Sequence, residues 1–96
     1  MTVKVTLNCQ LKRDLFEVLL PFLEKNLPTV RGFNGCVSVN VYFDSERAEM
    51  LLEEEWVSVE AHQSYLKFIE GNGVLGELAS HLSAAPTIKY FFNGGV

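Results

Sequence analysis

The sequence predicts an α+β fold, because it changes repeatedly between the residue spacing of a strand and that of a helix. Apolar and polar residues alternate, as in strands with one buried face, over four segments: Thr2–Cys9, Cys36–Phe43, Ala48–Val57 and Thr87–Phe92. Helical spacing separates the first strand from the second and the third from the fourth. The resulting order, β-α-β-β-α-β, is that of a ferredoxin-like fold with a four-stranded antiparallel sheet. The 96 residues predict a single domain, residues 1–96.

The first helix is expected directly after the first strand. Asp14 and Glu17 have the three-residue spacing of a capping box. An apolar stripe at helical spacing follows: Leu15, Val18, Leu19, Phe22 and Leu23. Pro21 lacks a backbone N–H, so we expect it to kink or split this helix. The helix should end at Leu27, because a residue before a proline, here Pro28, avoids helical angles.

The second and third strands are expected to form a hairpin around the short polar segment Asp44–Arg47. In the third strand one face carries Met50, Leu52, Glu54 and Trp56. A carboxylate on such an apolar face must be paired with a cation or have a raised pKa, and we expect pairing for Glu54.

A sharp corner joins the third strand to the second helical region. Trp56 closes the strand, Ser58 is a good helix cap, and His62 lies in the first turns of the helix. An indole and an imidazole on either side of one corner suggest a small pocket. The alternative is that Trp56 is an ordinary core residue and that His62 is exposed to solvent. Gly71 is expected to close the helix as a C-terminal glycine.

Composition excludes several classes of function. The net charge is −4 and the eight Lys and Arg residues are scattered, so nucleic acid is not expected as a partner. No apolar stretch is long enough to span a membrane, and the N-terminus has no signal-peptide pattern. Cys9 and Cys36 are interpreted as buried free thiols of a reducing cytoplasm, with a disulfide between neighbouring strands as the alternative.

The sheet face without helices is expected to be apolar. Whichever parity points outward, it should include either a valine-rich set or aromatic residues of the outer strands: Val37, Val39, Val41 and Phe43, or Tyr42, Tyr90 and Phe92. Monomers rarely expose so much apolar surface, so the sequence predicts a homodimer.

The common cofactor motifs are absent. There is no glycine-rich dinucleotide or P-loop motif, no H-E-x-x-H and no C-x-x-C. His62 and His81 stand on separate expected helices, so a metal site is not expected.

Two segments carry a family resemblance. Gly35–Tyr42 fits a G-C-x-x-x-x-V-Y strand, and Glu54–His62 fits an E-x-W-x-S-x-E-A-H corner. This pattern resembles the antibiotic biosynthesis monooxygenase family, and the leucine-rich helix around Pro21 is similar too. The resemblance implies a ferredoxin-like domain that pairs with a second copy into a dimeric α+β barrel. Some members oxidise aromatic polyketides or quinols with molecular oxygen and without metal, flavin or haem.

The resemblance also implies roles for individual residues. It makes Trp56 the pocket wall that stacks on the substrate, His62 the base or polar anchor, and Asn8 a hydrogen-bonding pocket amide. The residues expected to contact a small aromatic substrate are Trp56, Tyr65, Leu52, Leu66 and Phe22. No cofactor is expected.

The chain departs from the family pattern at several positions. Polyketide-oxidising members have an asparagine where this chain has Leu52 and a tyrosine where it has His62. The haem-degrading relatives have an iron-binding histidine where this chain has Leu66, which disfavours haem degradation. A dimeric small-molecule binding or stress-response domain without turnover is therefore the alternative to a monooxygenase.

Overall fold

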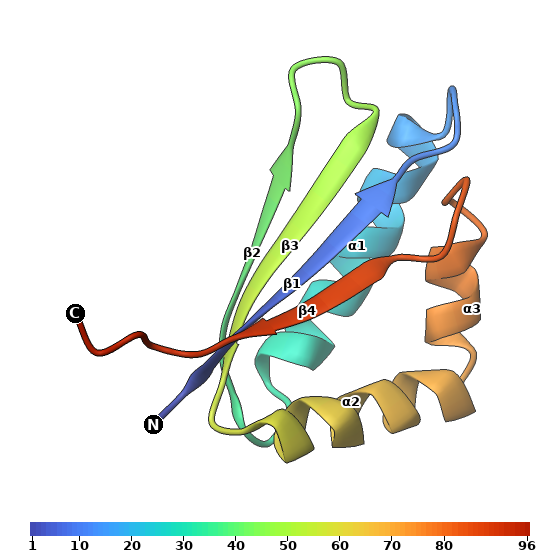
Figure 1. The fold of residues 1–96 in the computed structure, drawn as a ribbon. Helices are drawn as coiled ribbons and strands as arrows, with labels where there is room; N and C mark the ends of the chain where they lie inside the picture. The colour runs from blue at the N-terminus through green and yellow to red at the C-terminus, as the bar shows by residue number, and fades with distance from the viewer.

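The computed structural model describes residues 1–96 and has the predicted order of elements. Four strands and three helices follow one another as β1 Val3–Gln10, α1 Phe16–Arg31, β2 Cys36–Phe43, β3 Glu49–Trp56, α2 Val59–Gly71, α3 Val74–Ala79 and β4 Thr87–Phe91. The sheet order is β2-β3-β1-β4 and every neighbouring pair is antiparallel. All three helices lie on one side of this sheet (Figure 1). The predicted ferredoxin-like fold is confirmed.

The core lies between the sheet and the helices, where alternate residues of β1 and β3 point. The register places Leu7 opposite Leu52 and Cys9 opposite Met50, so the two inward rows meet side by side. The inward residues of β1 and β3 are all buried: Val3, Val5, Leu7, Cys9, Met50, Leu52, Glu54 and Trp56. The parity predicted for both strands is therefore confirmed.

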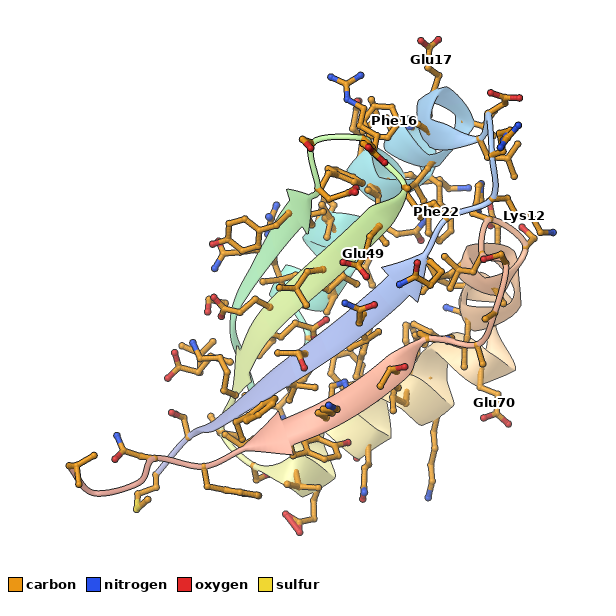
Figure 2. The ribbon with its side chains drawn as sticks, turned by 45° about the horizontal axis from the view of Figure 1, so that its top comes forward. Lys12, Phe16, Glu17, Phe22, Glu49 and Glu70 are labelled. Carbon is orange, nitrogen blue, oxygen red and sulfur yellow. The ribbon has the colours of Figure 1, made fainter.

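The open face of the sheet is more polar than predicted. The valine-rich side of β2 pairs in register with the inward residues of β3, so Val39 and Val41 face the helices. Figure 2 shows Glu49 on the face that no helix covers, whereas Phe22 lies behind the sheet. On the open face the large apolar residues are Tyr42, Leu51 and Phe91, among charged and polar neighbours.

Helix α1 differs from the local expectations in three places, at Pro21, at Leu27 and at its first turn. It runs unbroken through both Pro21 and Pro28, and no side chain caps its first turn. Both prolines are exposed, so the carbonyls that lose a backbone partner can bond to water, while the opposite face of the helix packs on the sheet. The expected capping box fails because Asp14 has a left-handed backbone, with φ of 65°, one residue too early to cap the helix.

The corner after β3 has the predicted cap but a different end. Ser58 Oγ accepts a hydrogen bond from the backbone N–H of Ala61, at 3.1 Å. Gly71 is the last residue of α2, and the left-handed position belongs to Gly73, with φ of 86°, directly before α3. The local rule placed the glycine turn two residues too early.

Both cysteines are free thiols, as predicted. Cys9 is buried on β1, whereas Cys36 is only partly buried on β2. Because β3 lies between these two strands, the alternative of a disulfide between neighbouring strands is wrong. None of the helices combines the length and apolar character needed to cross a membrane.

Candidate functional site

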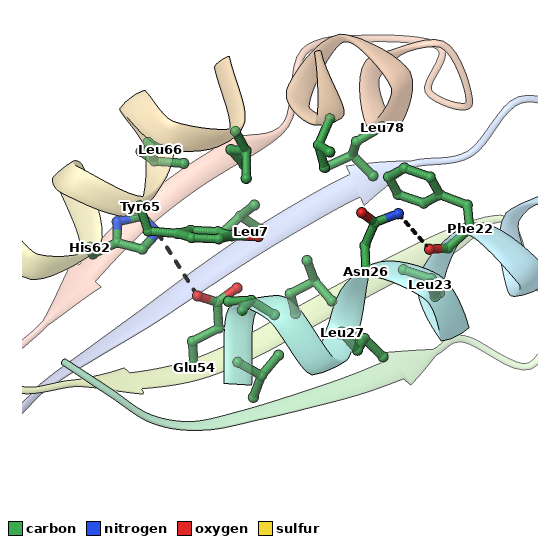
Figure 3. A pocket seen from close by; sticks show the side chains of 15 residues that line it. Leu7, Phe22, Leu23, Asn26, Leu27, Glu54, His62, Tyr65, Leu66 and Leu78 are labelled. Carbon is green, nitrogen blue, oxygen red and sulfur yellow. Dashed lines mark hydrogen bonds and ion pairs between the residues drawn. The ribbon is translucent and has the colours of Figure 1, made fainter. Parts of the chain in front are cut away.

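A cavity opens between the sheet and the helices (Figure 3). It contains about 550 Å³ of space outside the protein atoms, mouth included, and the centre of a water molecule fits into about 50 Å³ of it. One water needs roughly 10–15 Å³ on that measure, so the cavity admits one slender molecule. Its wall is mainly apolar, with four polar groups: Asn26, Glu54, His62 and Tyr65.

Glu54 is the acidic group of this cavity. Its side chain comes from the inward face of β3 and the residue is only 3% exposed. Trp56 Nε1 donates a hydrogen bond to Glu54 Oε1 at 2.8 Å. Burial raises the pKa of Glu54, and the hydrogen bond from Trp56 opposes this rise only in part. No Lys or Arg lines the cavity, so the expected ion pair is replaced by a carboxyl group with raised proton affinity.

His62 faces Glu54 across a short gap. Its Nε2 lies 3.9 Å from Glu54 Oε1, and its Nδ1 shares a hydrogen bond of 2.8 Å with the hydroxyl of Tyr90. Burial lowers the pKa of His62 to about 4. The imidazole is therefore neutral at pH 7, which makes it a weak base and a dipolar neighbour rather than a counter-ion for Glu54.

Trp56 supports the cavity without lining it. The indole is 0% exposed and packs between the rings of His62 and Tyr65, with centroid distances of 5.4 and 5.5 Å. The prediction that Trp56 forms a wall against which a substrate stacks is contradicted by this burial. Its contact with the cavity is indirect, through the hydrogen bond to Glu54.

The other expected contact residues do reach the cavity. Leu52 comes from β3, Tyr65 and Leu66 from α2, and Phe22 from α1, and all four lie in its wall. Burial raises the pKa of Tyr65 to about 12, so its phenol is uncharged at pH 7. Contact of these residues with a substrate stays a prediction.

Asn8 is placed away from this group. The inward residues of β1 are its neighbours Leu7 and Cys9, so Asn8 points to the open face of the sheet. There its Oδ1 accepts a hydrogen bond from Gln10 Nε2 at 3.1 Å. Successive side chains of a strand point to opposite faces of the sheet, so an amide at this position cannot enter the cavity.

Sequence reasoning missed two cavity groups. The strand pattern places Glu54 on the same face as Leu52 and Trp56, but it does not assign Glu54 to the site. Asn26 is polar and so falls outside the expected apolar stripe of α1, although it follows Phe22 by four residues and Leu23 by three and therefore lies on the same face. Nowhere do three or more His, Cys, Asp or Glu side chains gather as a metal site would require.

Comparison with known proteins supports the fold. No family model and no curated protein matches the chain. Among solved structures, Rv0793 from Mycobacterium tuberculosis is 17% identical, with a TM-score of 0.82 over 97% of this chain and 95% of that one. A structure described as an antibiotic biosynthesis monooxygenase is 15% identical, with a TM-score of 0.84 over 95% and 97%. A conserved protein from Methanosarcina mazei Go1 is 15% identical, with a TM-score of 0.84 over 95% and 91%. At such identities the likeness establishes a shared fold.

Proposed function

We propose that this chain is a member of the antibiotic biosynthesis monooxygenase family and oxidises a small aromatic, quinol-like or polyketide-like molecule with O2. The observation that carries the proposal is the apolar cavity in which the carboxyl of Glu54 has a raised pKa. An enzyme that ionises a weakly acidic phenol or enol needs such a base in a water-poor site. The shared fold of a structure described as an antibiotic biosynthesis monooxygenase supports the same class.

The proposed reaction begins with proton transfer from the substrate to the free oxygen of Glu54. The resulting phenolate or enolate is electron-rich and passes electrons to O2, so the substrate is its own reductant and no cofactor is required. One oxygen atom replaces two hydrogen atoms of the substrate. The second oxygen atom leaves as water together with those hydrogen atoms, which balances the reaction.

The neighbouring residues would prepare Glu54 for this role. The Trp56 N–H fixes one carboxyl oxygen, so the other is free to meet the substrate. Neutral His62 presents Nε2 to the carboxyl at 3.9 Å without supplying a positive charge, so the carboxylate stays basic. The apolar wall excludes water, which would compete for the proton.

The experiment is an oxygen-electrode assay with anthrone and hydroquinone as substrates. We expect uptake that survives exhaustive chelation and yields one product oxygen atom per O2 consumed, traced with isotopic oxygen. Saturable binding of both compounds without any uptake would contradict the oxygenase and favour the second candidate.

The second candidate is a small-molecule binding or stress-response domain without turnover. It is favoured by the position of Trp56, which is wholly buried and so cannot stack on a substrate. The two candidates share the cavity and differ only in whether O2 is consumed.

We also propose that two copies pair through their open sheet faces. Tyr42 and Phe91 are about half exposed there, at 51% and 50%, and two sheets packed face to face would cover them. Light scattering during size exclusion should then give twice the 10.8 kDa chain mass. A monomer at all concentrations would contradict this pairing.

A further inference from the structure

Asn26 is a cavity group for which the proposed reaction has no role. It lies on α1 and its Nδ2 donates to the backbone carbonyl of Phe22 at 2.8 Å. A carbonyl oxygen can only accept, so the amide nitrogen must face Phe22 and the amide oxygen is the atom left free. Figure 3 shows this amide raised from α1 into the cavity, near Leu78. Every wholly buried polar side-chain atom of the chain has a partner, so the unpaired Oδ1 is not wholly buried, and Asn26 is one of the residues that line the cavity.

Glu54 offers a second free acceptor at the other end of the same space. Its Oε1 is occupied by the Trp56 N–H, while Oε2 has no partner and lines the cavity. In Figure 3 Glu54 lies beside His62 and Tyr65, and Asn26 lies at the opposite end beside Phe22 and Leu78. Apolar side chains separate these two ends.

We infer that Asn26 is a specificity-determining residue that makes the cavity select an apolar aromatic molecule with a hydroxyl donor at each end. This inference rests on the proposed function for the role of Glu54. It adds Asn26 as a second residue that binds a hydroxyl of the ligand. A ligand with one hydroxyl would leave Asn26 Oδ1 dry and unpaired, which costs binding free energy. An aromatic acid would bring a carboxylate beside Glu54 with no cation in the wall, so the cavity rejects it.

The test is an anaerobic NMR titration, which measures binding without any turnover. The probes are two matched pairs. Hydroquinone is paired with phenol, and a naphthalenediol that carries its hydroxyls on opposite rings is paired with the corresponding naphthol. A further probe is para-hydroxybenzoate. We expect the wild-type chain to bind one of the diols roughly tenfold more tightly than its partner with one hydroxyl, and para-hydroxybenzoate not at all.

The decisive variant is Asn26→Leu, which keeps the number and branching of the side-chain heavy atoms and removes both amide atoms. The preference for the diol should fall to about twofold, the statistical factor of two equivalent hydroxyls, and the partner with one hydroxyl should bind more tightly than it binds the wild-type chain, because no amide oxygen is then left unpaired. Asn34→Leu makes the same change at an exposed loop asparagine and should keep the preference. An unchanged melting temperature of Asn26→Leu shows that its fold is intact.

The outcomes separate the inference from the proposed function. The role of Asn26 is overturned if the wild-type chain binds diols and their partners with equal affinity, or if Asn26→Leu keeps the full preference. Neither result contradicts the proposed oxygenase activity. A preference that depends on Asn26 together with no oxygen uptake supports the role of Asn26 and overturns the oxygenase. If none of the phenols binds, both are overturned.

Discussion

Three consecutive glutamates on β3 show that the two faces of one sheet give the same carboxyl group different surroundings. Glu53 and Glu55 point to the open face, where Lys4 Nζ lies 3.0 Å from one and 3.8 Å from the other. Glu54 points to the helices, is 3% exposed, and meets only an indole N–H and a neutral imidazole. Burial raises the pKa of Glu54.

The difference comes from strand parity rather than from sequence context. Side chains reverse their direction at each residue of a strand, so neighbours that are identical in the sequence meet water and lysine on one side and a desolvated cavity on the other. A carboxylate in water with a cation nearby is a poor base, whereas one without either has a raised affinity for protons. The predictions below test this contrast.

The largest effect is expected for Glu54→Gln. The amide keeps the size of the side chain and still accepts the Trp56 hydrogen bond, but it cannot take a proton. Loss of a general base lowers kcat by about a hundredfold to ten-thousandfold. The measurement is the rate of oxygen uptake at saturating hydroquinone.

The matched control is Glu53→Gln, one residue away on the open face. Its rate should stay within about twofold of the wild-type rate, since the side chain points away from the cavity. Equal losses in both variants would show that parity does not separate the roles of these glutamates.

The second prediction concerns the free energy of unfolding as the pH falls. His62 has a pKa of about 4 in the folded chain, against 6.5 for the free side chain. Between these values the unfolded chain binds the proton and the folded chain does not, so stability falls as the pH drops from about 6.5 to 4. The loss from this group is roughly 3 kcal/mol, at about 1.4 kcal/mol for each pKa unit.

Urea unfolding of the wild-type chain and His62→Gln at a series of pH values measures this loss. Glu54 acts in the opposite direction, because its pKa is raised and its contribution declines as the pH rises above the ordinary carboxyl value of 4.5. The difference between the two proteins isolates His62. A difference that does not change with pH would contradict the buried neutral imidazole.

Trp56→Phe should have a smaller effect on the reaction. It removes the N–H that partly offsets the raised pKa of Glu54, so the pKa of Glu54 should rise further. We expect the acidic limb of the pH–rate profile to move to higher pH, so that the rate at a pH on that limb falls about tenfold, or about 1.4 kcal/mol, for each pH unit that the limb moves.

Phe33→Leu is the control for this variant. Phe33 packs against Trp56 at a centroid distance of 6.2 Å but makes no hydrogen bond to Glu54. This control should loosen the same aromatic cluster and leave the acidic limb in place. If the acidic limb of the pH–rate profile moves equally in Trp56→Phe and Phe33→Leu, the shift comes from altered packing and not from the lost hydrogen bond.

The fold was predictable because periodicity and parity survive in each strand. The alternation in β1 and β3 identified the inward residues, and Ser58 marked the start of α2. Local rules failed where packing outweighed them. Pro21 and Pro28 stay inside α1 because the opposite face of that helix is buried against the sheet.

The site was predictable only in part, because a pattern names residues without placing their atoms. Leu52, Tyr65, Leu66 and Phe22 lie on inward faces, and the structure brings them to one cavity. Trp56 lies on the same face, yet neighbouring rings bury it completely, which spacing cannot reveal. Glu54 and Asn26 had the required parity or helical spacing, but their partners were unknown without coordinates.

The smallest effect is expected for Lys4→Met on the open face. Glu53 beside it raises the pKa of Lys4, but the ammonium is solvated, and exposed pairs contribute little to stability. In solution dilute enough to separate the proposed dimer, the urea midpoint of the variant should match that of the wild type within repeated measurements. At high protein concentration the proposed pairing of sheets would enclose Lys4 together with Glu53, and removing the cation would then leave a carboxylate without a partner.

A lower midpoint that appears only at high concentration therefore supports the pairing. A shift of the same size at every concentration would mean that the pair stabilises the isolated chain, and that the two sheet faces differ less than their glutamates indicate.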